Sequence, residues 1–381
     1  MNNNMVYLDN AATTRPARAV IDAVTISLGE GFFNPSALYK PSVETAREIE
    51  RCRKLIKSSL QAEQVVFTSG GTEANNLAIL GHLGNLRQGG RVLYSQAEHP
   101  SVKAACQAAP EKFEAIGIPL DAGGRINLQS LSELLTADTR MVCVMQVNNE
   151  TGAIQPLGDA AELVREKAPD AWFHVDGVQG FLRLPMRIKD AGIDSYALSG
   201  HKIHGPKGIG ALALGGKRNL EPRLFGGGQE AGLRSGTENT PGIAGLFAAV
   251  LDFPGENWMR SHKLRLYEHL KAAIPTLSIN GPEPDSLDAC DHIINLSFPP
   301  VRAETMLHAM EAKGVYVSHG SACSSRKNRH SETLKAMGVS RAALAGAIRF
   351  SLSPYTTEKE IELAVRATIE AYEALKAFTR R

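Results

Sequence analysis

TRMVCVMQV, at residues 139–147, is an almost uninterrupted apolar run near the middle of the chain. A strand covered by helices on both faces has such a run because both of its faces are buried. Other apolar, β-branched runs lie on either side, at residues 65–68, 91–95, 171–175, 195–198 and 210–214. Helical patterns occur between them, at residues 73–82, from about 102, and at 157–167. Strands that alternate with helices predict an α/β domain with a mostly parallel sheet covered by helices.

The pattern changes after about residue 252. Helical patterns cover residues 258–273, 303–313, 331–337 and 358–378, and short strand patterns cover 293–298, 315–318 and 347–353. Two or three strands with helices predict a smaller α+β domain. The length of 381 residues agrees with two or three domains.

The composition is that of an ordinary globular chain, with 43% hydrophobic and 22% charged residues. It excludes collagen-like, disordered and disulfide-scaffold proteins. Lys plus Arg number 42 and Asp plus Glu number 40, so a net charge of +2 gives no reason to expect nucleic acid as a direct partner. No apolar run approaches the ~20 residues that cross a bilayer, and residues 1–9 lack signal-peptide features. We therefore expect a cytoplasmic protein with no membrane partner.

Five cysteines are spread over the chain, at Cys52, Cys106, Cys143, Cys290 and Cys323. The odd number, the long spacings and the lack of Cys-x-x-Cys argue against a disulfide framework and against a tetrahedral zinc site. We expect no metal. Each cysteine is by default an inert small hydrophobe, and the composition leaves open whether any of them does chemistry.

Small, polar and ionisable residues follow four of the predicted strands directly. In an open parallel sheet, ligands bind beyond the carboxyl ends of the strands. Four such clusters at the same topological position predict a single site. The clusters are residues 69–72 (SGGT), 148–150 (NNE), 176–179 (DGVQ) and 199–202 (SGHK).

The first cluster fits an anion cradle. Its glycines let the backbone approach a ligand, and a helix N-terminus offers N–H groups and a partial positive charge. The alternative is a glycine-rich turn in which Thr72 caps the helix. It is not a Walker loop, because no lysine follows at the required spacing.

For each of three ionisable residues, the sequence allows both a functional and a structural interpretation. Asp176 ends an apolar strand, where a carboxylate is costly unless it is paired with a cation, and a pyridinium nitrogen would be such a partner. The alternative is a structural ion pair or a helix cap. Lys202 is either a Schiff-base lysine with a depressed pKa or a solvated surface lysine. His99 is either a ring that stacks on a planar cofactor and moves protons or a helix-entry histidine.

The motifs of this chain resemble those of one family nearly from end to end. They are similar to the pyridoxal-phosphate-dependent cysteine desulfurases of the NifS/IscS type, in the class V branch of the fold-type-I aminotransferases. The matching motifs are residues 7–14 (YLDNAATT), 34–36 (NPS), 68–76 (TSGGTEANN), 98–99 (EH), 147–152 (VNNETG), 174–179 (HVDGVQ), 199–208 (SGHKIHGPKG), 226–239 (GGGQEAGLRSGTEN), 320–324 (GSACS) and 348–351 (IRFS).

The resemblance implies a fold and a cofactor site. Residues 15–252 are expected to form the large pyridoxal 5'-phosphate (PLP) domain, and residues 1–14 with 253–381 the small domain that carries the cysteine loop. Lys202 is expected to bind the cofactor covalently, Asp176 to keep its pyridine nitrogen protonated, and Gln179 to contact its 3-oxygen. The remaining cofactor-binding residues implied are His99, stacked on the ring; Asn149; Gly71, Thr72, Ser199, Gly200 and His201 around the phosphate; and Thr237, which would reach the phosphate of a neighbouring subunit in a homodimer.

The resemblance also implies the catalytic thiol and the substrate contacts. Cys323 lies in SHGSACSS (318–325), a small and polar segment followed by basic residues that could lower its pKa; the alternative is a buried, inert cysteine. Asn34 and Arg349 are expected to bind the substrate carboxylate, which a guanidinium can hold with two hydrogen bonds. Lys202, Cys323 and His99 are the implied catalytic residues, with His99 protonating or deprotonating the substrate thiol.

The implied reaction converts L-cysteine to L-alanine and leaves the sulfur as a persulfide on Cys323. An acceptor protein, an iron–sulfur scaffold or a tRNA- or cofactor-thiolation enzyme, would then take the sulfur. The alternatives are a selenocysteine lyase and a class V aminotransferase, which would need a keto acid but no loop cysteine. A non-enzymatic scaffold would be expected to lack Lys202 or Asp176, and both are present. The chain departs from many family members at residues 37–39 (ALY), at Ala231 and in its basic residues after Cys323.

Overall fold

The computed structural model describes residues 5–216, 220–255, 258–320 and 331–378. Cys323 and the basic residues that follow it lie outside these described residues. Within the described residues, no helix is both long enough and apolar enough to span a membrane.

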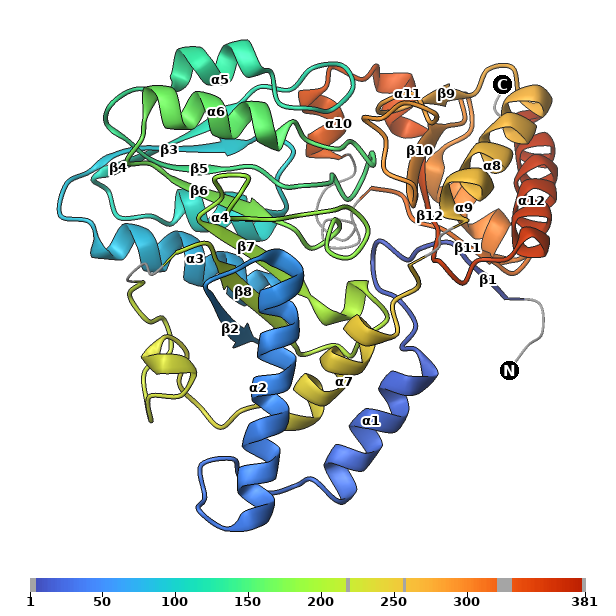
Figure 1. The fold of residues 1–381 in the computed structure, drawn as a ribbon. Helices are drawn as coiled ribbons and strands as arrows, with labels where there is room; N and C mark the ends of the chain where they lie inside the picture. The colour runs from blue at the N-terminus through green and yellow to red at the C-terminus, as the bar shows by residue number, and fades with distance from the viewer. Residues whose placement is uncertain (1–4, 217–219, 256–257, 321–330, 379–381) are drawn as a thin grey trace.

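A seven-stranded sheet forms the centre of the larger part of the molecule (Figure 1). Six of its strands run in the same direction, and β8 is antiparallel to both of its neighbours, β2 and β7. In sheet order, the strands are β2 (Gln64–Thr68), β8 (Gly210–Leu214), β7 (Ser195–Ser199), β6 (Trp172–Asp176), β5 (Thr139–Cys143), β3 (Gly90–Ser95) and β4 (Phe113–Ile118). The predicted mostly parallel, helix-covered α/β architecture is confirmed.

Helices cover both faces of this sheet because successive strand residues point to opposite faces. Val66 packs into one buried cluster, with α3 (Gly71–Asn85) and α4 (Pro100–Gln107). Its neighbours Val65 and Phe67 pack into the other buried cluster. The helices of that second face are α2 (Lys40–Leu60), α5 (Leu128–Leu134), α6 (Leu157–Lys167) and α7 (Thr240–Leu251), and α1 (Arg18–Gly29) packs against α7.

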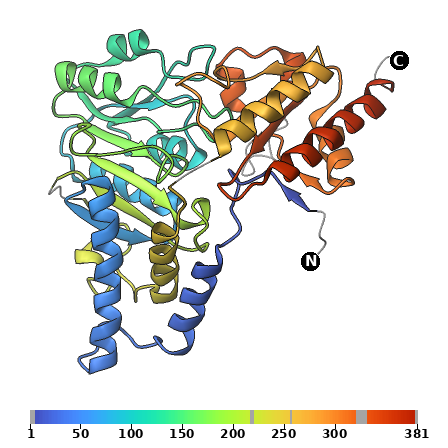
Figure 2. The same cartoon turned by 45° about the vertical axis from the view of Figure 1, so that its right-hand side comes forward.

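A second, smaller group of elements lies beside the large sheet (Figure 2). The central strand β10 (Ile293–Ser297) pairs antiparallel with β12 (Ala347–Ser351) and β9 (Ser278–Ile279). The N-terminal strand β1 (Val6–Tyr7) pairs parallel with β11 (Val315–Tyr316). These strands share a separate apolar cluster with the long helices, which are α8 (Met259–Ala273), α9 (Ala303–Glu311) and α12 (Glu358–Lys376). Two short helices, α10 (Glu332–Ala336) and α11 (Arg341–Ala345), lie between β11 and β12.

The predicted strand at residues 139–147 is too long, because β5 ends at Cys143. Beyond it the chain stays buried and keeps backbone hydrogen bonds to β6, from Val144 N to His174 O (3.1 Å) and from Gln146 N to Asp176 O (2.9 Å). An apolar run indicates that a segment is buried, not that it is paired in a sheet. Here the chain remains buried after the strand pairing with β3 has ended. Several elements were not predicted from the sequence: α1, β4, α5, α7, β1, β9 and α11.

Candidate active site

A cavity lies at the carboxyl ends of the parallel strands, next to the small group of elements. This edge of an α/β sheet is where such folds bind small molecules. Ten of the predicted site residues line it: Gly71, Thr72, His99, Asn149, Asp176, Gln179, Ser199, His201, Lys202 and Arg349. The polar clusters that follow β2, β5, β6 and β7 therefore meet in one place, as the sequence predicts.

Lys202 ends the short 3₁₀ helix η1 (Gly200–Lys202), directly after β7. Its Nζ donates to the carbonyl oxygens of Ala11 (2.6 Å) and Ala12 (2.7 Å). The side-chain amide of Gln179 donates to the Ala11 carbonyl as well (2.9 Å). The N-terminal segment thus crosses the cavity beside the lysine and fixes the position of its amine.

Asp176 ends β6 and is almost fully buried. Its Oδ2 accepts from Asn75 Nδ2 (2.8 Å) and its Oδ1 from the backbone N–H of Val178 (3.0 Å). No cation of the described residues forms an ion pair with it. A buried carboxylate that has hydrogen bonds but no cationic partner suits a ligand that brings a positive charge.

The anion cradle is built from the start of α3 and the segment after β7. The helix begins at Gly71, with Gly70 (φ 153°) as its N-cap, so Thr72 lies inside the first turn and does not cap it. A Cβ on Gly71 would come within 2.6 Å of Val178, which explains why a glycine is required there. Free N–H groups of the first helical turn favour an anion. Burial and the neighbouring Lys202 lower the pKa of His201 to about 4, so its imidazole is neutral.

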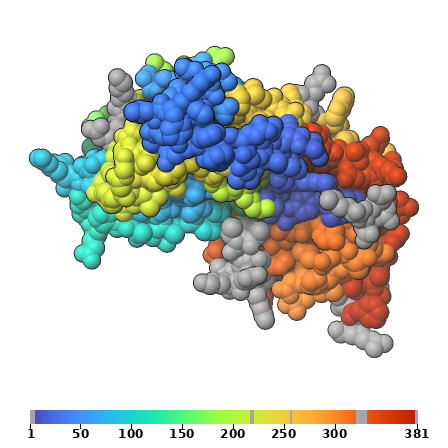
Figure 3. All heavy atoms as spheres, turned by 90° about the horizontal axis from the view of Figure 1, so that it is seen from below, coloured from blue at the N-terminus to red at the C-terminus, as the bar shows by residue number. Residues whose placement is uncertain are grey.

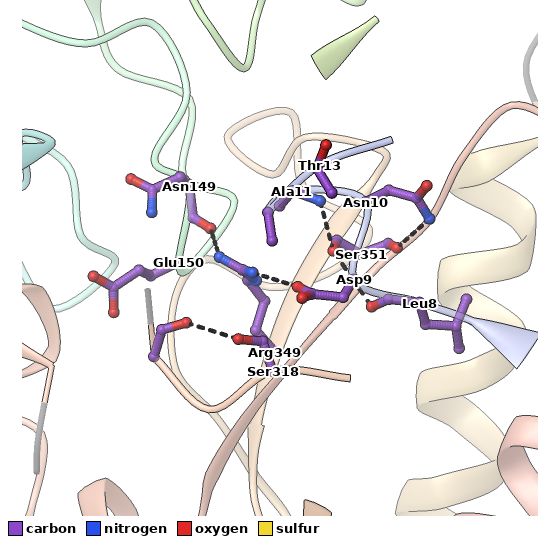
Figure 4. A network of polar contacts seen from close by, with 12 residues as sticks. Leu8, Asp9, Asn10, Ala11, Thr13, Asn149, Glu150, Ser318, Arg349 and Ser351 are labelled. Carbon is purple, nitrogen blue, oxygen red and sulfur yellow. Dashed lines mark hydrogen bonds and ion pairs between the residues drawn. The ribbon is translucent and has the colours of Figure 1, made fainter. Parts of the chain in front are cut away.

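Arg349 reaches the cavity from β12 and is itself almost fully buried (Figure 4). Its Nη2 donates to Asp9 Oδ1 (2.6 Å) and its Nη1 to the carbonyl oxygen of Asn149 (2.8 Å). Its Nε is buried without a partner. The guanidinium is therefore held from two sides, by the N-terminal segment and by the loop after β5, and still has N–H groups to offer a carboxylate.

Four predicted site residues do not line this cavity. Gly200 is buried next to it in η1. Asn34 is exposed in the connection between α1 and α2, where its Oδ1 accepts from Ser36 N (2.9 Å). Thr237 is exposed on the loop before α7, and Cys323 lies outside the described residues.

The sequence analysis missed six lining residues: Ala11, Ala12, Asn75, Ser101, Met145 and Val178. A signal existed for four of them, because Ala11, Ala12, Asn75 and Val178 lie in the motifs YLDNAATT, TSGGTEANN and HVDGVQ. Met145 had none, since its thioether is part of an apolar run that reads as core.

The other four cysteines, Cys52, Cys106, Cys143 and Cys290, are free and buried. Cys143 lies in β5 and Cys52 in α2, and burial raises the pKa of Cys52 to about 12. The expectation that these thiols are inert small hydrophobes agrees with their burial. None of them lines the cavity.

Comparison with known proteins gives the same family as the motifs. The aminotransferase class-V family matches residues 6–363. The chain belongs to the class-V aminotransferases. A cysteine desulfurase of Nostoc sp. is 35% identical over 384 residues, which cover 99% of this chain and 95% of the relative. The cysteine desulfurase IscS of Clostridium botulinum is 35% identical over 369 residues, or 94% and 92% of the two chains. Within the class-V family, this chain is therefore a cysteine desulfurase of the NifS/IscS type.

Solved structures of this family have the same fold. A NifS-like protein superposes with a TM-score of 0.87 at 30% identity, over 97% of this chain and 100% of its own. The structure of SspA in complex with cysteine gives a TM-score of 0.80 at 33% identity, over 92% and 99% of the two chains. Class-V aminotransferases and cysteine desulfurases are PLP enzymes, and the cavity described above is the candidate active site of this member.

Proposed function

We propose that this enzyme uses PLP to convert L-cysteine to L-alanine and passes the sulfur through a persulfide on Cys323 to an acceptor protein. One observation carries the proposal: Lys202, the cation-free Asp176 and the guanidinium of Arg349 line the same cavity, beside a helix N-terminus. The lysine amine matches an aldehyde, and the Asp176 carboxylate matches a pyridinium. The Arg349 guanidinium matches a carboxylate, and the helix N-terminus matches a phosphate.

The residues present fit PLP. The buried Asp176 would pair with a protonated pyridine nitrogen, which supplies the charge that the carboxylate lacks here. Gln179 Oε1 is buried without a partner and lines the cavity, so it can accept from a ring hydroxyl. The start of α3, with Thr72, Ser199 and His201, would hold the phosphate. When bound, PLP supplies an electron sink for the bonds at the substrate α-carbon.

Lys202 and Arg349 have separate tasks toward the substrate. The Lys202 amine would hold the cofactor covalently and, once released from it, move a proton at the α-carbon of the substrate. Arg349 would bind the substrate carboxylate with its remaining N–H groups, since the planar guanidinium matches a carboxylate. Asn149, whose backbone carbonyl steadies Arg349, also lines the cavity with its side chain.

Cys323 is the proposed nucleophile, assigned from its GSACS motif. Its thiolate attacks the substrate sulfur, so an S–S bond forms while the carbon–sulfur bond breaks. The electron pair of that bond stays with the carbon fragment, which takes up a proton and leaves as alanine. An acceptor thiol would then take the terminal sulfur; an iron–sulfur scaffold or a thiolation enzyme of the cytoplasm is the proposed acceptor.

Two assignments require a homodimer. Thr237 and Asn34 are exposed and lie away from the cavity of their own chain, so they would act in the site of a second copy. A groove between α1, α2 and α7 supports such an assembly, because partly or fully exposed apolar residues line it beside charged ones. The apolar residues include Ile26, Phe33, Phe247 and Leu251, and the charged ones are Glu30, Glu44, Glu48 and Arg51. Figure 3 shows α1 and α2 (blue) across this face of the molecule, beside the yellow 220–240 segment.

The domain boundaries at residues 14/15 and 252/253 are also proposed. The buried apolar clusters support these boundaries. The two clusters of the large sheet contain residues from 20 to 249 only. The cluster of the smaller group of elements contains Val6, Leu8 and residues from 259 to 372. A small cluster of Ala11, Val147, Cys290 and Ile293 joins the two parts near the cavity.

The test is an assay of L-cysteine turnover without any keto acid. We expect the wild type to release alanine and to carry transferable sulfur, and Cys323→Ala to lose both. Cys290→Ala is the matched control, because Cys290 is a buried cysteine outside the cavity. Lys202→Ala should also lose the visible absorbance of the bound cofactor. Alanine formation by Cys323→Ala at the wild-type rate would contradict the role of Cys323, and a requirement for a keto acid would identify an aminotransferase.

A further inference from the structure

A continuous line of buried side chains connects the core of the large sheet to His99 in the cavity. Trp172 Nε1 lies 2.6 Å from Ser195 Oγ, which lies 2.8 Å from His174 Nδ1. On the other side of the imidazole, His174 Nε2 lies 3.0 Å from Asn75 Oδ1. Asn75 Nδ2 lies 2.9 Å from Ser101 Oγ, which in turn lies 2.8 Å from His99 Nδ1.

The orientation of the Asn75 amide is fixed by its partners. Nδ2 faces an oxygen of Asp176 at 2.8 Å, and a carboxylate can only accept. The two N–H groups of Asn75 therefore go to Asp176 and Ser101. Its carbonyl Oδ1 is left to face His174 Nε2, which must donate a proton to it.

The proton positions on His174 then follow. Complete burial lowers the pKa of His174 to about 3, so the ring is neutral and carries its one proton on Nε2. Nδ1 must accept from Ser195 Oγ–H. Ser195 Oγ can accept in turn from Trp172 Nε1, which is a donor only. Every donor in this part of the line has an acceptor.

The same reasoning determines the tautomer of His99. The backbone N–H of Ser101 donates to His99 Nδ1 (3.2 Å), so Nδ1 is an acceptor. Ser101 Oγ accepts from Asn75 and directs its own hydrogen to the same Nδ1. A neutral His99 therefore has its proton on Nε2, and Nε2 makes no hydrogen bond to the described residues.

We propose that Asn75 and Ser101 are positioning residues that hold His99 as a neutral imidazole protonated on Nε2, so that His99 donates a hydrogen bond into the cavity and does not act as a general base. The consequence for the substrate sulfur rests on the proposed function, whereas the tautomer itself does not. In this form His99 stabilises a thiolate that accepts from Nε2–H. It has no lone pair facing the cavity with which to take the thiol proton.

The surroundings of His99 also favour its neutral form. Burial lowers the pKa of His99, and the nearby Lys202 and Lys103 act in the same direction, against the opposing effect of Asp176. A proton added to Nδ1 would face the backbone N–H of Ser101. Two independent features, the direction of the hydrogen bonds and the local charge, thus oppose an imidazolium.

The first test reads the tautomer directly, by ¹⁵N NMR of the histidine-labelled holoenzyme. The His99 signal is assigned by its loss in His99→Gln. We expect a neutral ring protonated on Nε2 at pH 7, and a detectable Nδ1–H population in Asn75→Leu. Asn76→Leu is the matched control one residue further along α3, where the side chain bonds Thr72 O outside the line; it should keep the wild-type signal.

Ser101→Ala is the second variant, in case Asn75→Leu does not fold. In Asn75→Leu the Ser101 hydroxyl is free to turn and accept from Nδ1–H, whereas Ser101→Ala removes that acceptor and leaves only the backbone N–H facing Nδ1. We therefore expect a smaller Nδ1–H population in Ser101→Ala than in Asn75→Leu. A wild-type His99 that is protonated on Nδ1, or positively charged at pH 7, would overturn the proposal.

The second test separates a hydrogen-bond donor from a base by alanine formation from L-cysteine. His99→Gln keeps an N–H donor but cannot take a proton, and His99→Leu can do neither. Both lose the aromatic ring, so stacking is lost equally. We expect His99→Gln to be about tenfold faster than His99→Leu; equal rates would contradict the donor role. A wild type that forms no alanine would refute the proposed function while leaving the NMR result intact.

Discussion

At the scale of single residues, the buried guanidinium of Arg349 depends on Asp9. The carboxylate lies 2.6 Å from Nη2, and Arg349 is 1% exposed (Figure 4). A buried cation that loses its partner becomes both costly and poorly oriented. The Asp9 carboxylate therefore prepares Arg349 for the substrate carboxylate without contacting the reacting atoms.

Asp9→Ala is expected to raise KM for L-cysteine about tenfold, or ~1.4 kcal/mol, while kcat changes by less than about threefold. Asp9→Asn keeps an oxygen that can accept from Nη2, so its effect should be smaller. Steady-state kinetics of alanine formation measures both. A fall in kcat at constant KM would show that Asp9 acts on the chemical step instead.

At the scale of elements, the loop before α7 is fastened to the large sheet by one buried side chain. Glu230 accepts from Arg53 Nη1 (2.6 Å), Arg53 Nη2 (2.9 Å) and the backbone N–H of Phe67 (2.8 Å). Glu230 and Ala231 both have a positive φ, near 50° and 56°. Backbone strain of this kind persists only when surrounding contacts hold it, and the ion pair with α2 is such a contact.

Glu230→Ala is expected to lower the free energy of unfolding by about 2–3 kcal/mol, measured by urea denaturation. Breaking a fully buried ion pair by removing one partner typically costs ~3–5 kcal/mol of stability. The loss expected here is at or below the lower end of that range, because the Arg53 side chain is 21% exposed. Asp22→Ala breaks the surface pair of α1 with Arg18 and should change stability by less than about 0.5 kcal/mol. Similar losses in both variants would contradict the special role of Glu230.

At the scale of the whole molecule, a buried neutral histidine at the centre of the large sheet makes the fold sensitive to acid. Burial lowers the pKa of His174 to about 3 from an ordinary value of 6.5. The unfolded chain therefore binds a proton between these pH values that the folded chain does not. The stabilisation is complete above pH 6.5 and is lost progressively as the pH falls toward 3.

Between pH 7 and pH 5 this one group should lower the free energy of unfolding by about 2 kcal/mol. His174→Gln cannot titrate, so its loss of stability over the same interval should be smaller by that amount. Urea denaturation of both proteins at the two pH values gives the comparison. An identical pH dependence in the two would mean that folding does not lower the pKa of His174.

The proposed homodimer makes a further prediction at this scale. Ile26 on α1 is 57% exposed and lines the groove with α2 and α7. A carboxylate at position 26 would be desolvated on association, in a groove that Glu30, Glu44 and Glu48 also line. Ile26→Asp is therefore expected to shift the molar mass from two chains to one in light scattering. Leu287→Asp alters an equally apolar, 89% exposed residue outside the groove and should leave the mass unchanged. A wild type with the mass of one chain would refute the dimer.

Sequence by itself determined the alternation of strands and helices and the main chemical groups of the cavity. Apolar runs report burial, and polar residues after Thr68, Asp176 and Ser199 mark strand ends, because both signals are local. The same signals predicted β5 too long, because the chain stays buried beyond the point where the strand pairing between β5 and β3 ends. They also missed α1, whose packing partner α7 is distant in sequence.

Only the tertiary structure decided how the parts of the site are held. Asp9 and Arg349 are 340 positions apart in sequence, and Lys202 bonds carbonyls 190 and 191 positions away. The line from Trp172 through Asn75 to His99 joins β6, α3 and the start of α4, and its hydrogen-bond directions exist only when all its members are in place. Sequence specifies which groups are available, but proton positions and ion-pair partners depend on three-dimensional neighbours.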